Sequence, residues 1–188
     1  MRLGWLQRTT LVLIFPLLLS ACVTLNESEC ETANWRDLGQ RNGQSGRAAS
    51  YVVEHEKACA KYGIPVDSAS WRAGWEVGIR QYCTPQNGLR VGRNGSSYAQ
   101  SCPADVAPGF ERAYKVGKRV HSAKRDRDAI TREIDRLNSS IGAAADEKER
   151  LEIQTSLIVK QSELRSAEDR LRDAERDADQ IRYSFAAD

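Results

Sequence analysis

No run of apolar residues in this sequence is long enough to cross a membrane. The longest stretch, residues 11–19, has nine residues and is interrupted by Pro16, whereas a spanning helix needs about 20. Two arginines precede the stretch, and the small residues Ser20 and Ala21 follow it. This pattern predicts a signal peptide over residues 1–21 that is removed during export.

The end of that stretch, Leu19-Ser20-Ala21-Cys22, resembles a bacterial lipobox. The resemblance implies cleavage before Cys22 and attachment of acyl chains such as palmitate, which anchor stably in a membrane when two or more are present. Val23 stands where an aspartate would retain an enterobacterial lipoprotein at the inner membrane. We therefore expect the outer membrane, facing the periplasm, ahead of the inner membrane. The alternative is an ordinary signal peptide that happens to precede a cysteine.

The sequence also lacks an excess of positive or negative charge. The formal net charge of +2 comes from Arg2 and Arg8, and residues 23–110 hold nine basic and nine acidic side chains. Proteins that bind nucleic acid need clustered lysines and arginines with a net positive field. The sequence therefore predicts no nucleic-acid partner and no basic patch for a membrane surface.

Histidine is scarce, with two in 188 residues. His55 begins the segment His55-Glu56-x2-Cys59, which resembles half of a zinc-protease motif but lacks the second histidine. His121 lies in a charged segment without diagnostic neighbours. We therefore predict no catalytic residues, no metal and no cofactor, and the protein is not expected to be an enzyme.

Close pairs of cysteines, which metal sites use, are absent. The four cysteines after Cys22 are separated by 29, 24 and 19 residues, and an even number in an exported chain predicts two disulfides. Cysteines near the adjoining ends of predicted helices favour the pairs Cys30–Cys59 and Cys83–Cys102 over the other two pairings.

From Glu111 onward the sequence has no proline, cysteine or tryptophan, and 34 of its last 78 residues are charged. This shift predicts an all-α chain with a small disulfide-stapled head at 22–104, followed by a long helical segment at 105–188. Turn signals, a capping box at Ser28 and Glu31, and an N-cap at Asp67 place three head helices at about 28–43, 47–62 and 67–83. A faint repeat of aromatic and small residues runs through the chain, with coincidence as the alternative: Trp35-x3-Gly39-x3-Gly43, Trp71-x2-Gly74-x3-Gly78 and Phe110-x3-Tyr114-x2-Gly117.

The segment 105–188 has coiled-coil spacing, with Leu157, Leu164 and Leu171 at every seventh position. The regular spacing of apolar residues is interrupted between Ala144 and Ile153, next to a stretch that contains glycine and alanine. We therefore predict an antiparallel hairpin with its turn near 139–145. The two arms carry opposite net charges, which favours their pairing. The alternative is one continuous helix that pairs with another chain.

Between Cys83 and Cys102 lies a segment rich in glycine and asparagine, which we interpret as a loop. Glycines would let backbone amides face a ligand, arginines would add positive charge and tyrosines would stack. The spacing matches neither a P-loop nor a dinucleotide motif, and a purely structural loop is the alternative. The candidate ligand residues are Tyr82, Gly88, Arg90, Gly92, Arg93 and Tyr98.

Most of the chain after Cys22 resembles a lipoprotein family catalogued as domain of unknown function 2799, with the helical tail as the least diagnostic portion. The most specific part of the resemblance is the pattern Tyr82-Cys83-Thr84, Asn87-Gly88, Gly92, Tyr98 and Cys102-Pro103. The resemblance implies location and architecture, and it adds no catalytic residues. We expect a lipid-anchored envelope protein with a structural or protein-interaction role, binding an envelope protein or the cell wall through the hairpin. The alternative is a ligand-binding or enzymatic head.

Overall fold

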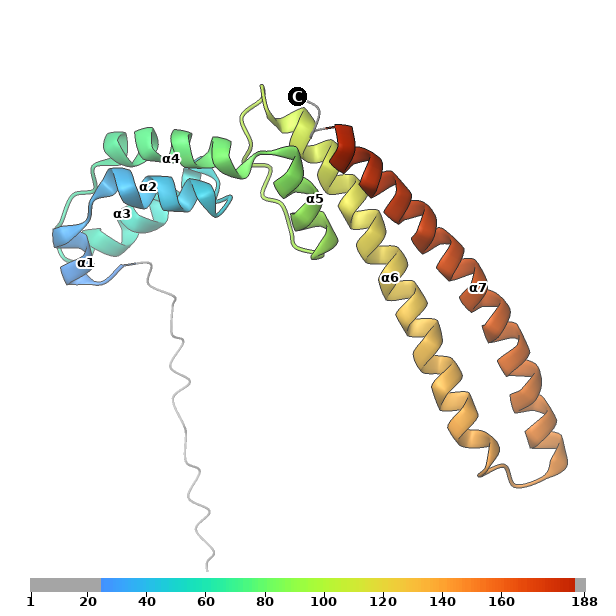
Figure 1. Ribbon diagram of the computed structural model, residues 1–188. Helices are drawn as coiled ribbons and strands as arrows, with labels where there is room; N and C mark the ends of the chain where they lie inside the picture. The colour runs from blue at the N-terminus through green and yellow to red at the C-terminus, as the bar shows by residue number, and fades with distance from the viewer. Residues whose placement is uncertain (1–24, 185–188) are drawn as a thin grey trace, which may run out of the picture.

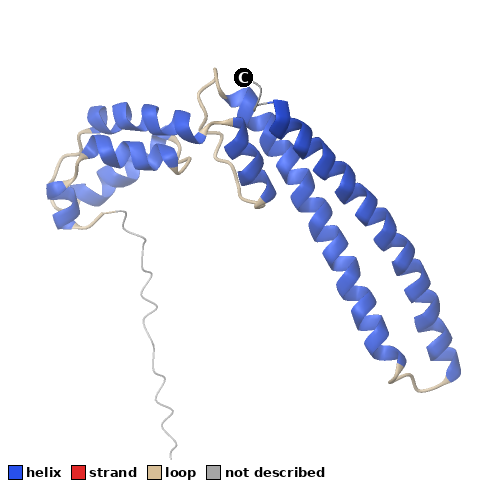
Figure 2. Cartoon of the chain, viewed as in Figure 1, coloured by secondary structure: helices blue, strands red, loops and turns tan. Residues whose placement is uncertain are grey.

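The computed structural model of the protein describes residues 25–184, so the predicted signal peptide and Cys22 lie outside the described residues. Every regular element in the described part is helical (Figures 1 and 2). None of these helices is long and apolar enough to cross a membrane. In chain order they are α1 (Glu27–Thr32), α2 (Trp35–Gln44), the 3₁₀ turn η1 (Ala49–Tyr51), α3 (Val52–Ala60), α4 (Ser68–Tyr82), α5 (Pro85–Arg93), α6 (Ala107–Ile141) and α7 (Glu147–Ser184).

The helices form two groups, as Figure 1 shows. Helices α1 to α4 pack together at one end, and α5 lies against the long antiparallel hairpin of α6 and α7. Only Cys83 and Thr84 separate α4 from α5. The predicted all-α head with a long helical hairpin is therefore confirmed, although α5 packs on the hairpin and not on the other head helices.

Glycines bring α2 and α4 into direct backbone contact. A Cβ atom on Gly39 would overlap the carbonyl group of Trp71, and one on Gly43 would lie 2.6 Å from the carbonyl oxygen of Trp75. From the other helix, Gly74 and Gly78 lie equally close to the backbone of α2. Glycines spaced four residues apart thus let the backbones of α2 and α4 come closer than any side chain would allow. We call α2 with α4 the first helix pair.

Helices α5 and α6 repeat this arrangement and form the second helix pair. Gly88 lies against the carbonyl group of Phe110, and Gly92 lies against that of Tyr114. In α6, Gly117 lies close to the backbone of α5 in return. Each contact matches one in the first pair, shifted by 49 positions between α2 and α5 and by 39 positions between α4 and α6.

The equivalence extends to the segments that end α2 and α5. Gly46 and Gly95 both have φ +73°, and both follow the last turn of their helix. The indole Nε1 of Trp75 donates to the carbonyl oxygen of Arg47 at 2.8 Å. At the corresponding place, the hydroxyl of Tyr114 donates to the carbonyl oxygen of Ser96 at 3.0 Å. The predicted aromatic and small-residue repeat is thus a duplicated helix pair, whose α5 member the sequence reading missed.

The start of the head differs from the prediction. Residues 28–43 form two helices because Ala33 leaves the helical conformation and Asn34 caps α2 through the Asp37 amide. The capping box of α1 consists of Asn26 and Glu29, two residues earlier than the expected Ser28 and Glu31. In contrast, α4 begins after Asp67, the predicted N-cap.

Two disulfides hold the chain on either side of the junction between α4 and α5. Cys30 is bonded to Cys59 and Cys83 to Cys102, each with a Cα separation of 5.7 Å. This is the pairing that the sequence favours. The first disulfide fastens α1 to α3, and the second fastens the end of α4 to the segment before α6. A core around the fully buried Trp71, Ile79 and Phe110 connects the two helix pairs.

The hairpin turn covers residues 142–146, which overlaps the predicted turn and begins three residues later. Close to the head, α7 packs on both α5 and α6, and Ala174 and Ala178 are buried there. Fewer ion pairs connect the two arms than their opposite net charges suggest. Among the described residues, one ion pair connects α6 to α7, between Arg119 and Asp177 at 2.7 Å. Most other pairs lie within a single helix.

Candidate functional site

The predicted ligand loop is largely a helix, which corrects our interpretation of its glycines. Residues 85–93 form α5, whose first turn is capped by Thr84 through the Asn87 amide at 3.2 Å, with Pro85 at the first helical position. Gly88 and Gly92 are buried against α6. Their role is close helix packing, so their backbone amides face no ligand.

Tyr82 and Tyr98 belong to an aromatic cluster between the helix pairs. Their ring centroids lie 5.2 and 4.8 Å from that of Phe110. The Tyr98 hydroxyl accepts from the Cys102 amide at 3.2 Å, and the Tyr82 ring covers Gly46. Burial raises the pKa of both phenols above the ordinary tyrosine value. These contacts indicate packing and not ligand stacking.

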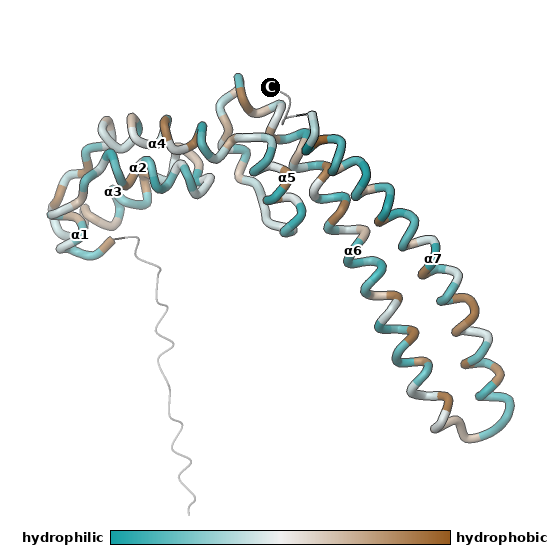
Figure 3. Tube along the Cα trace, viewed as in Figure 1, coloured by the Kyte–Doolittle hydropathy of each residue, from teal (hydrophilic) through white to brown (hydrophobic). Residues whose placement is uncertain are grey.

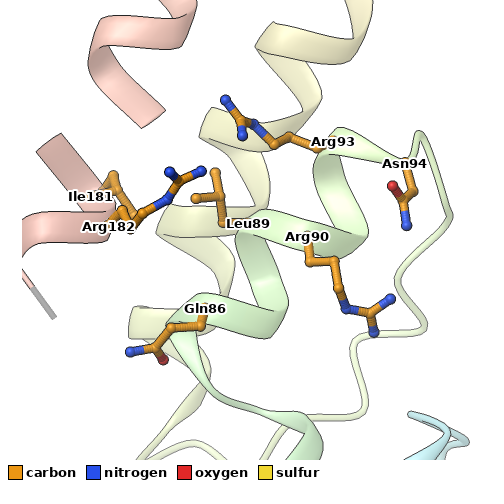
Figure 4. Close-up of a pocket in the computed structure, with 7 residues that line it drawn as sticks. All are labelled: Gln86, Leu89, Arg90, Arg93, Asn94, Ile181 and Arg182. Carbon is orange, nitrogen blue, oxygen red and sulfur yellow. The ribbon is translucent and has the colours of Figure 1, made fainter. Parts of the chain in front are cut away.

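The two arginines of the predicted site extend in different directions from α5. Arg90 donates to Asn87 Oδ1 through Nε at 3.0 Å and points away from α7 (Figure 4). Arg93 forms an ion pair with Glu175 of α7, and its buried Nε has no hydrogen-bond partner. The structure therefore does not gather the six predicted ligand residues at one site.

A cavity of about 410 Å³ does lie between α5 and the end of α7. Its floor is apolar, formed by Leu89 and Ile181, and Arg182 reaches from α7 toward Leu89 (Figure 4). The carboxylate of Asp179 lies 3.7 Å from Arg182 and partly balances its charge. Arg90 points away from α7 (Figure 4), and Arg93 and Arg182 each pair with an acidic residue of α7, so no shared anion-binding arrangement forms around this cavity.

His55 is buried inside the first group of helices, with 2% of its surface exposed. Its Nε2 lies 2.9 Å from Asn42 Oδ1, which also accepts from the indole nitrogen of Trp71 at 3.0 Å. Burial lowers the pKa of His55, and the nearby carboxylate of Glu54 opposes this shift. The neutral imidazole thus links α3 to α2 and α4, and its surroundings show no reacting group.

His121 is also a packing residue. Its Nδ1 donates to the Arg93 carbonyl oxygen at 3.1 Å, and its ring lies over Gly95 in the position that Tyr82 takes over Gly46. Between residues 25 and 184, no group of histidine, cysteine and acidic side chains is arranged to hold a metal ion.

The distal half of the hairpin, away from α5, holds three of the seven exposed large apolar residues among residues 25–184, and the other four lie in the head or at the end of α7. In α6 no residue after Val120 is buried, and in α7 Leu157 is the only buried residue before Ala167. Leu151 and Ile158 lie on another face of α7, with 54% and 68% of their surfaces exposed. Figure 3 shows hydrophobic positions on both arms in this half.

Leu151 and Ile158 are part of a regular row along α7, which we call the outer row. Its six residues follow alternating spacings of four and three, which place them on one face of a helix. All six are exposed. The members are Glu147, Leu151, Gln154, Ile158, Gln161 and Arg165.

Sequence reasoning missed the outer row because the stronger heptad of Leu157, Leu164 and Leu171 occupies the same helix. Two apolar residues among four polar ones give a weak signal. The exposed fractions identify the row, since the two series lie on different faces of α7. A search for a second row with coiled-coil spacing on the same helix would have found it.

Comparison with known proteins gives one match. Residues 34–119 match the family described as "Protein of unknown function (DUF2799)". This part of the chain belongs to that family. The matched region contains the first helix pair and the glycine contacts of the second, and it ends inside α6, so the distal hairpin and the outer row lie beyond it. No curated protein and no solved structure matches the chain.

Proposed function

We propose that the protein is a lipid-anchored component of the bacterial envelope whose distal hairpin binds another protein in the periplasm. The observation that carries the proposal is the exposure of Leu151 and Ile158 on α7, where more than half of each side chain contacts solvent. Exposed large apolar residues that gather on one face favour a binding surface.

The hairpin is suited to reach a partner at a distance from the head. Helix α6 has 35 residues, which corresponds to about 50 Å at 1.5 Å per residue. Its first part is fixed to α5 by the glycine contacts of the second helix pair. The head therefore holds the hairpin, and the hairpin presents the apolar residues away from the head.

Export and anchoring rest on the sequence and on the disulfides. A lipobox ending in Cys22 predicts acylation, and paired cysteines are typical of an oxidising compartment such as the periplasm. With Val23 in the second position, we place the anchor in the outer membrane. A ligand-binding head has weaker support because the side chains proposed for it diverge or pack in the core.

In-cell photo-crosslinking tests the interaction. A benzophenone amino acid at Ile158 in the full-length protein should give a discrete, slower band after illumination. The same substitution at Arg170, which is exposed on a different face of α7, is the matched control and should give none. Equal or absent crosslinking at the two positions would contradict the proposed interaction.

Anchoring is tested separately with Cys22→Ser. We expect the precursor to stay unprocessed, or the protein to leave the membrane fraction, and labelled palmitate no longer to be incorporated. Density-gradient separation of the wild-type membranes should recover the protein with the outer membrane. Palmitate labelling of the Cys22→Ser variant would refute the assignment of the anchor.

A further inference from the structure

We propose that the partner of the outer row is the outer row of a second copy of this chain, aligned antiparallel. This inference rests on the proposed function and specifies the protein that the hairpin binds. The row has the alternating spacing with which two helices form a coiled-coil seam. Leu151 and Ile158 are its second and fourth members, with Gln154 between them and Gln161 after Ile158.

The charges at the ends of the row determine the direction of pairing. Glu147 begins the row and Arg165 ends it. Two identical rows aligned in parallel would bring like charges together at both ends. Aligned antiparallel, each Glu147 faces Arg165 of the second copy, and the interface gains two ion pairs related by twofold symmetry.

The same antiparallel alignment pairs each apolar residue of the row with a glutamine of the second copy. Each Leu151 faces Gln161 of the second copy, and each Ile158 faces Gln154, whose side chain has an aliphatic stem and an amide. Both leucines and both isoleucines then lie in one continuous seam. The row is self-complementary in charge and in polarity, a property that a surface adapted only to solvent does not require.

Neither Glu147 nor Arg165 forms a strong ion pair within the described part of the chain. Arg165 forms no ion pair among residues 25–184, and Glu147 has one partner, Arg150, at 3.5 Å, with the two side chains 73% and 48% exposed, respectively. Such an exposed pair contributes little to stability. Both groups are therefore available to a second copy.

The surroundings of the row also favour a second copy. Helix α5 covers the hairpin near the head, but no described segment covers the distal half. Residues 147–167 of α7 carry four basic and four acidic side chains, so two copies meet without net repulsion. Val159, 51% exposed, adds apolar surface beside the row.

The test is a charge swap in the purified full-length protein in detergent, with molar mass measured by sedimentation and light scattering. The wild type should be a dimer in equilibrium with monomer. Arg165→Glu and Glu147→Arg should each weaken dimerisation by about tenfold or more, because two ion pairs become two repulsive contacts. The double variant should restore it. Arg170→Glu makes the same charge change on another face of α7 and should leave the dimer intact.

The outcomes separate the two proposals. A wild-type protein that stays monomeric at all concentrations, or a dimer that ignores both charge reversals, overturns self-association. If crosslinking at Ile158 in cells then yields a band with a different protein, binding by the hairpin stands and the second copy is wrong. If it yields no specific band, both proposals fail. A crosslinked band composed of two copies of this chain supports both.

Discussion

Gly74 lies directly against the carbonyl oxygen of Arg36, so close that a Cβ atom at Gly74 would overlap that oxygen. In the second helix pair the equivalent position is Ala113, which is fully buried. The duplicated unit thus tolerates a methyl group at this position in one copy, whereas the first copy has no room for it. The first pair is packed more tightly at this point.

Replacing Gly74 with alanine should destabilise the protein by about 3 kcal/mol, because α2 and α4 must separate to admit the methyl group. Gly142→Ala is the matched control, since Gly142 has φ −70° and nothing within 4 Å of its Cβ position. That variant should be unchanged or up to about 1 kcal/mol more stable. Denaturant unfolding measures both, and equal losses would contradict the packing argument.

Removing the Cys83–Cys102 disulfide by a double substitution with serine should cost about 3 kcal/mol of unfolding free energy. The bond closes a loop over a sequence separation of 19 residues, and it fixes the start of the second helix pair to the segment before α6. Unfolding of the variant and of the reduced wild type should both occur at lower denaturant. An unaltered midpoint after reduction would show that this bond does not restrain the unfolded chain.

Acidification should weaken the fold through His55. Burial lowers the pKa of His55 in the folded state, so below the ordinary histidine pKa of about 6.5 the unfolded chain binds the proton first. The stabilisation is complete above that pH and declines as the pH falls through 6.5 toward the folded pKa. In the variant His55→Gln, the free energy of unfolding should depend less on pH below about 6.5. This prediction holds for any change in stability that the substitution causes at pH 8. If the free energy of unfolding of the variant falls with pH as steeply as that of the wild type, another titratable group causes the pH dependence.

Leu157→Ala should cost about 2–4 kcal/mol, because Leu157 is 7% exposed and shortening a buried leucine leaves a cavity. Val159→Ala, two residues away on a side chain that is 51% exposed, should change stability by less than about 0.5 kcal/mol. Thermal unfolding of the two variants at matched concentration compares the faces of α7. Similar losses would mean that the hairpin pairs differently.

Much of the architecture follows from local sequence signals. The loss of proline, cysteine and tryptophan after Glu111 separates the long helices from the stapled region, and Asp67 marks the start of α4 as expected. These signals are local, since caps and composition act within a few residues. Helix pairing across 30 or more residues depends on shape, and the small-residue repeat indicates it only faintly.

The error over α5 has a physical cause. Glycine and asparagine favour turns in isolation, and on that basis the sequence predicts a loop at Gly88 and Gly92. Contact with the backbone of α6 stabilises a helix that intrinsic propensity disfavours. The spacing of these glycines is the same as that of Gly39 and Gly43, and this shared spacing is the signal that would have corrected the interpretation.

From Lys118 to Ile141, helix α6 contains neither glycine nor proline, so the common causes of a helix kink are missing. The helix therefore acts as a spacer of nearly constant length, about 35 Å from the last glycine contact to the turn. Each seven-residue insertion matched in both arms would extend its reach by about 10 Å and preserve the facing side chains. Selection for a given distance between the head and the hairpin turn would act on the number of such units rather than on the head.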